Sequence, residues 1–180
     1  FLTQASALNH AANLDCEFVQ TDVFEINSEF HNQFDLIMIT IGALCWLPEL
    51  RSFFEVVSNL LRESGNLFIY EMHPILDMFE DTASEDPLEI KYSYFKSDPW
   101  IETQGLDYYT KESYQSSMKY CFHHKLSDII SEILSHKMSL KHFHEYEHDI
   151  SNIFRHMEEI EPKPPLCYTL VAEKYSPPSK

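Results

Sequence analysis

Residues 34–74 carry two apolar runs joined by one amphipathic segment, and they restrict the fold more than any other stretch. The first run, residues 36–41, is rich in β-branched side chains and ends at Gly42, which is typical of a strand buried on both faces. Residues 67–70 have the same character. Because the segment between the runs is long enough for a helical crossover, the runs are predicted to be adjacent parallel strands, with residues 37–41 as the first.

A single apolar stripe marks the connecting segment as a helix that packs on the sheet. Pro48 suits the first helical turn, where its missing N–H has no partner within the helix. Apolar side chains then recur every three or four residues, at Leu50, Phe53, Phe54, Val57, Leu60 and Leu61. Ser64 and Gly65 are predicted to end the helix, with Gly65 in the left-handed conformation.

Weaker signals on both sides extend the pattern into one α/β domain that covers residues 1–180. A helix is predicted over residues 1–13 and a short strand over residues 16–20. Near the other end, a helix that begins near Ser127 is followed by strands at residues 139–146 and 167–174.

The region between the central unit and the helix near Ser127 is rich in aromatic residues. Residues 89–95, 100–102 and 114–122 alternate polar and apolar side chains as antiparallel strands do. We therefore expect an antiparallel insertion between elements of the main sheet, at about residues 79–125.

Charge and cysteine spacing exclude several function classes. The formal net charge of −16 argues against a nucleic-acid partner, because such binding depends on Lys and Arg against phosphates. The four cysteines are far apart and include no C-x-x-C pair, which indicates a reduced, cytoplasmic protein without a disulfide framework or zinc site. His142 and His144 share a strand face, but a metal needs three or four convergent ligands, so no metal is expected. No apolar stretch is long enough to span a membrane.

Glycine is scarce. The chain has 3 glycines in 180 residues, against a usual ~7%, and they are too scattered to form a phosphate-binding loop. The sequence also begins at Phe1, inside a helical pattern, so a preceding segment is expected.

The order of the elements resembles that of class I S-adenosylmethionine-dependent methyltransferases. The matching pieces cover nearly the whole chain and read FVQTDVFEI, FDLIMITIGALCWLPEL, LLRESGNLFIYEMHP, LSDIISEIL, SLKHFHEYEH and CYTLVAEK. The resemblance implies a Rossmann-like, mostly parallel sheet of strand order 3-2-1-4-5-7-6 whose last strand is antiparallel. It implies S-adenosyl-L-methionine as cofactor and a small molecule as methyl acceptor. The family's first strand, glycine-rich loop and ribose-binding acid would then precede Phe1, and the insertion would be a substrate flap.

The resemblance also assigns cofactor contacts. Asp22 follows a strand at the position that accepts the adenine amino proton, or it is only a turn residue. Val23 would lie near the ring. Thr40, Ile41 and Gly42 end the central strand, where the backbone approaches the methionine portion and a Cβ on Gly42 would obstruct it.

Acceptor and catalytic roles fall on five further residues. Trp46 lies just beyond the strand end and would line the acceptor pocket, or it only caps the helix that follows. His123 or His124 would contact the substrate from the flap. Methyl transfer depends mainly on proximity and orientation, and a base is needed only if the acceptor must lose a proton. His73, with Glu71 behind it, is the candidate for that base.

Two alternatives remain open. Tyr92 and Lys96 have the Y-x-x-x-K spacing of short-chain reductases. An NAD(P)-dependent oxidoreductase with a similar sheet is therefore one alternative. A catalytically silent binding module of the same fold is the other.

The implied strand order carries an expectation about stability. Without the first two strands, residues 37–41 would form an exposed apolar edge, which is a template for pairing with another chain. We expect the 180 residues not to form a stable, active monomer alone, but to dimerise or to pair with a separate chain that carries the preceding segment.

Overall fold

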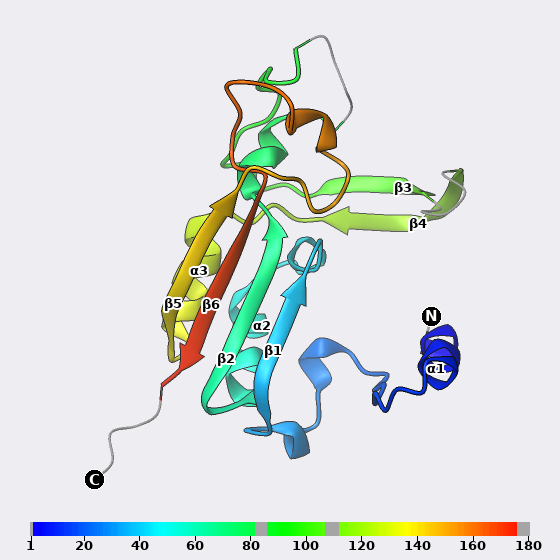
Figure 1. The fold of residues 1–180 in the computed structure, drawn as a ribbon, viewed down its shortest axis with the longest axis vertical. Coiled ribbons are helices and arrows are strands. Elements are labelled where there is room, and N and C mark those ends of the chain that lie inside the picture. The colour runs from blue at the N-terminus through cyan, green and yellow to red at the C-terminus, as the bar shows by residue number, and fades with distance from the viewer. Residues whose placement is uncertain (1, 82–85, 107–111, 176–180) are drawn as a thin grey trace.

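The computed structural model describes residues 2–81, 86–106 and 112–175, and in it six strands form two sheets (Figure 1). The main sheet has the order β1-β2-β6-β5, and β3 and β4 form a separate hairpin. The strands are β1 (Phe34–Thr40), β2 (Leu61–Met72), β3 (Trp100–Leu106), β4 (Ser113–Cys121), β5 (Met138–Tyr146) and β6 (Cys167–Lys174). The α-helices are α1 (Leu2–Ala11), α2 (Arg51–Leu60) and α3 (Leu126–Ser135). Short 3₁₀ turns are η1 (Val23–Glu25), η2 (Ser28–Phe30), η3 (Leu44–Trp46), η4 (Pro74–Met78) and η5 (Arg155–Met157).

The central prediction is confirmed, and the fold is α/β with a mixed sheet. β1 and β2 are adjacent and parallel, and Ile37 pairs with Leu67 and Ile39 with Ile69. β6 is antiparallel to both β2 and β5. The order β1-β2-β6-β5 corresponds to the 4-5-7-6 half of the implied sheet. β1 is an edge strand among the described residues, and the expectation that this edge pairs with another chain stays a prediction.

The end of α2 differs from the prediction. The helix ends at Leu60, and the residue with positive φ is Ser64 (60°), so the assignment of that conformation to Gly65 was wrong. The free carbonyls at the helix end are satisfied from other segments: Lys174 Nζ donates to the Ser58 oxygen at 2.6 Å, and the N–H groups of Asn32 and Gln33 donate to the oxygens of Asn59 and Leu60. Glycine is needed at 65 because a Cβ there would lie 2.8 Å from the Phe34 carbonyl oxygen.

Two predicted strands are absent from the described residues. Residues 16–20 form no strand, because no other strand lies beside them to complete a ladder. Residues 89–95 also form none, since the N–H groups of Lys91 and Tyr92 both donate to the carbonyl of Met78. The predicted strands at 100–102 and 114–122 do pair, as β3 and β4. Residue 1 of the predicted first helix, and residues 82–85 and 107–111 of the predicted insertion, lie outside the described residues.

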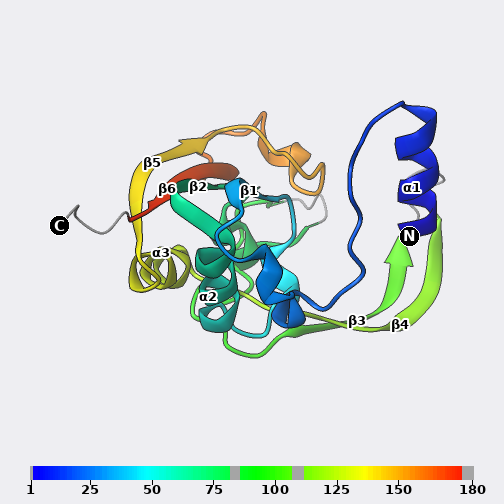
Figure 2. The ribbon, with the colours of Figure 1, turned by 90° about the horizontal axis from the view of Figure 1, so that it is seen from below.

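The two faces of the main sheet are covered unequally. α2 and α3 lie against one face, while α1 stands apart from the sheet in both views (Figures 1 and 2). Ile39 is 5% exposed and Leu67 0% on the helix-covered face, whereas Leu36 is 51% and Met38 59% exposed on the opposite face. We call the latter the open face. In the part of the chain that the structure describes, no helix has the length and apolar character needed to cross a bilayer.

Candidate functional site

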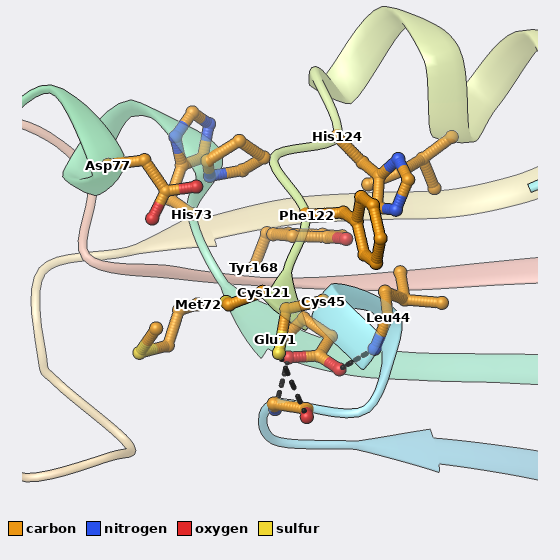
Figure 3. A pocket seen from close by; sticks show the side chains of 13 residues that line it. Leu44, Cys45, Glu71, Met72, His73, Asp77, Cys121, Phe122, His124 and Tyr168 are labelled. Atoms are coloured by element: carbon orange, nitrogen blue, oxygen red, sulfur yellow. Dashed lines mark hydrogen bonds between the residues drawn. The ribbon is translucent and has the colours of Figure 1, made fainter. Parts of the chain in front are cut away.

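The carboxyl ends of β1 and β2 meet at one edge of the sheet, where ligands bind in open parallel sheets. A cavity of about 100 Å³ lies there (Figure 3). We call it the strand-tip cavity. Its lining comes from the loop after β1, the end of β2, η4, the segment after β4, and α3: Gly42, Leu44, Cys45, Glu71, Met72, His73, Pro74, Asp77, Cys121, Phe122, His124, Ile129 and, from β6, Tyr168.

Glu71 holds the loop after β1 in place. Its carboxylate accepts the backbone N–H groups of Gly42 at 2.6 Å, Ala43 at 2.8 Å and Leu44 at 3.4 Å, as the dashed lines in Figure 3 show for part of the set. Gly42 has a φ of 74°, which a residue with a Cβ adopts only with strain. Hydrogen bonds to an ionised acceptor are roughly twice as strong as neutral ones, so the loop has one well-determined conformation.

His73 connects the end of β2 to η4. Its Nδ1 accepts the N–H of Ile75 at 3.2 Å, and its Nε2 lies 3.0 Å from Oε1 of Glu145. Burial lowers the pKa of His73, and the nearby Glu145 offsets this only in part. The ring is therefore neutral at pH 7, with its lone pair engaged by Ile75. The catalytic role of His73 and Glu71 stays a prediction, while their contacts are those of positioning residues.

The two histidines that follow β4 occupy different places. His124 lines the cavity, and its Nε2 donates to the Leu47 carbonyl at 2.8 Å. Burial is the main cause of its lowered pKa. His123 does not line the cavity; its Nδ1 lies 2.6 Å from Oδ2 of Asp77 and its Nε2 donates to the Tyr94 carbonyl at 2.8 Å. His123 thus supports Asp77, which does line the cavity.

The remaining predicted residues are dispersed. Thr40 and Ile41 are exposed at the end of β1, and only Gly42 of that group lines the cavity. Asp22 accepts the N–H of Phe24 at 2.9 Å as the cap of η1, and Val23 packs against the main core. Neither lines the strand-tip cavity.

Trp46 is the last residue of η3. Its side chain is 52% exposed, and it does not line the strand-tip cavity.

Sequence reasoning missed a pair of thiols. The Cys45 thiol donates to the Gly42 carbonyl oxygen at 3.3 Å, and interaction with Cys121, followed by burial, raises the pKa of Cys45. The neighbouring Phe122 N–H donates to the Cys45 carbonyl at 2.7 Å, which joins the segment after β4 to the loop after β1. No local pattern marks these residues, because they become neighbours only when the hairpin folds over the strand ends.

Comparison with known proteins identifies the fold. No family model matches the sequence, and no curated protein matches it either. Among solved structures, a protein described as an S-adenosylmethionine-dependent methyltransferase from Listeria monocytogenes has a TM-score of 0.64 at 15% identity, over 94% of this chain and 75% of that one. A second, from Clostridium acetobutylicum, has a TM-score of 0.62 at 16% identity, over 97% and 71%.

A third similar structure was solved with ligands bound. It is the 1,6-didemethyltoxoflavin N1-methyltransferase of Burkholderia thailandensis, with its acceptor and S-adenosylhomocysteine bound; the TM-score is 0.50 at 11% identity, over 95% of this chain and 56% of that one. At such identities the likeness concerns the fold alone. The chain has the class I S-adenosylmethionine-dependent methyltransferase fold.

Proposed function

We propose that this protein binds S-adenosyl-L-methionine and transfers its methyl group to a small molecule. The observation that carries the proposal is a cavity at the ends of β1 and β2, bordered by Gly42, in a fold shared with methyltransferases. The neighbour whose described acceptor is 1,6-didemethyltoxoflavin supports a small acceptor. The net charge of −16 also disfavours nucleic acid. The four free cysteines suit a reduced, cytoplasmic setting.

The end of β1 fits the methionine portion of the cofactor. A Cβ built on Gly42 would meet no atom within 4 Å, so the space beside its backbone is open. Thr40 and Ile41 are exposed beside it. In the proposal these three residues hold the methionine portion, and Asp22 and Val23 hold the adenine. The bound cofactor supplies a methyl group on a positively charged sulfur.

The chain's own residues contribute orientation. Glu71 fixes the loop at one side of the cavity, and His73 fixes the start of η4 at another. Since correct placement supplies much of the rate in such a displacement, we assign both residues a positioning role. His124 and Trp46 remain the proposed acceptor contacts, and His123 acts through Asp77.

Titration calorimetry tests this function. We expect S-adenosylmethionine and S-adenosylhomocysteine to bind, and Gly42→Val to weaken both at least 10-fold, because it fills the open space and strains the backbone. Met38→Ala, on the open face, is the control and should bind normally. Binding of NAD(P) with no response to S-adenosylmethionine would support the oxidoreductase instead, and binding of neither would support a silent module.

A further inference from the structure

A second cavity adjoins the strand-tip cavity on the side of the hairpin. It has a volume of about 230 Å³ and shares Met72, Asp77 and Cys121 with the strand-tip cavity. We call it the flap cavity. A molecule that occupies both would have one end at the strand tips and the other beneath the hairpin.

The walls of the flap cavity combine aromatic rings with carboxylates. The aromatic side chains are Phe79, Tyr92, Trp100 and Phe154. Four carboxylates, Asp77, Glu80, Asp81 and Glu102, lie among them. No Lys or Arg lines either cavity within the part of the chain that the structure describes. The flap cavity is therefore a region of negative potential with π faces.

The carboxylates are only partly neutralised. Glu102 pairs with Lys119 at 3.0 Å, and Asp77 contacts His123. Glu80 accepts the Tyr92 hydroxyl at 3.0 Å, and the nearby Lys91 ammonium is itself paired with Glu89 at 2.7 Å. The hydrogen bond to Glu80 and the charge of Glu80 are the main causes that raise the pKa of Tyr92, followed by burial and the charge of Asp81.

Trp100 already binds a cation. The ammonium of Lys96, which does not line the cavity, lies 4.7 Å from the centre of the Trp100 ring. Tyr92 meets that ring edge-on, with centroids 6.0 Å apart and an interplanar angle of 87°. Aromatic faces in this arrangement attract ammonium groups, and the attraction grows where water is excluded.

We propose that the flap cavity binds an organic cation, so that the methyl acceptor of this protein is a molecule with an ammonium group. The identification of the cation as part of the acceptor rests on the function proposed above; the binding of a cation does not. The ammonium group serves for recognition and is not the methylated atom. A nitrogen that the carboxylates keep protonated has no lone pair with which to attack the methyl group. The nucleophilic atom lies elsewhere in the molecule, toward Gly42 and the strand-tip cavity.

Matched ligands test the proposal by titration calorimetry. Choline is compared with 3,3-dimethylbutan-1-ol, which has the same shape without the charge, and phenethylamine with 2-phenylethanol. We expect at least one cation to bind 10-fold or more tightly than its neutral partner. The double variant Glu80→Gln/Asp81→Asn should reduce that ratio to below about 3, while it keeps an acceptor for Tyr92. Glu63→Gln, which removes one charge outside both cavities, should leave the ratio unchanged.

Two results would overturn the inference: equal binding within both pairs, or a ratio unchanged by the double variant. S-adenosylhomocysteine is titrated into the same samples, and this separates the two proposals. Cation binding without S-adenosylhomocysteine binding would reject the methyltransferase function and keep the cation site. The opposite result would keep the function and reject the cation site.

Discussion

The two faces of the main sheet are built from the same strands and yet differ in what they contribute. On the helix-covered face, Leu67, Ile69 and Leu170 are completely buried. On the open face, Leu36 and Met38 are more than half exposed, although they alternate with buried residues in the same apolar run. The whole apolar run therefore favours a strand. A side chain in that strand contributes much to the free energy of unfolding only if it points to the face that the helices cover. Three substitution pairs test this difference.

The largest difference is expected between a buried and an exposed apolar side chain. Leu67→Ala should lower the free energy of unfolding by about 2–5 kcal/mol, since it leaves a cavity under α2 and α3. Met38→Ala should change it by no more than about 0.5 kcal/mol, as surface substitutions usually do. Chemical denaturation with a constant m-value measures both. Equal losses would show that the open face is covered in solution.

A smaller difference is expected between two carboxylates. Glu71→Gln, on the covered face, weakens three hydrogen bonds to the loop after β1 and should cost about 1.5–3 kcal/mol. Glu173→Gln, on the open face, loses only a half-exposed ion pair with Lys141 and should cost at most about 1 kcal/mol. The same denaturation experiment compares them. A Glu71→Gln variant as stable as the Glu173→Gln variant would contradict the role assigned to Glu71.

The smallest difference concerns acid stability. Burial depresses the pKa of His73 from its ordinary value of 6.5, so below that pH the unfolded chain takes up a proton that the folded chain does not. His73 therefore reduces stability as the pH falls from about 6.5 to the depressed pKa. His73→Asn keeps an acceptor for the Ile75 N–H and should flatten the slope of stability against pH over that range. Met38→Ala, on the open face, changes no titratable group and should leave the slope unchanged, whereas a slope that His73→Asn also leaves unchanged would refute the assignment.

The sequence was sufficient for the centre of the fold. The run at 37–41, the stripe from Leu50 to Leu61 and the strand at 167–174 predicted β1, α2 and β6 with their directions. Their signals are periodic and extend over many residues. The predicted strands at 16–20 and 89–95 failed because a strand exists only with a neighbour, and a short alternating segment does not say whether it has one.

The site was predictable only in part. Gly42, Glu71 and His73 were expected near one another because the ends of parallel strands meet, and all three line the strand-tip cavity, while their roles stay predictions. The sequence did not predict that Asp77, Cys45 and Cys121 line this cavity. Cys121 ends the β3–β4 hairpin, and the sequence does not show where that hairpin lies relative to the sheet. Asp22 and Val23 were assigned by the resemblance; they lie at η1 and do not line the strand-tip cavity, and their contact with adenine stays a prediction.

The bonds from Glu71 to the loop after β1 have a consequence for cooperativity. They join residues 29 and 28 positions apart in the chain, so the loop acquires its conformation only after β2 has paired with β1. Local opening of the loop would break bonds to a buried carboxylate, so it costs more than the opening of a loop whose bonds are exposed to water. Amide exchange at Gly42 and Ala43 should consequently be slower than at exposed loops of the chain. The pairing of β1 with β2 thus also limits how freely this loop can open.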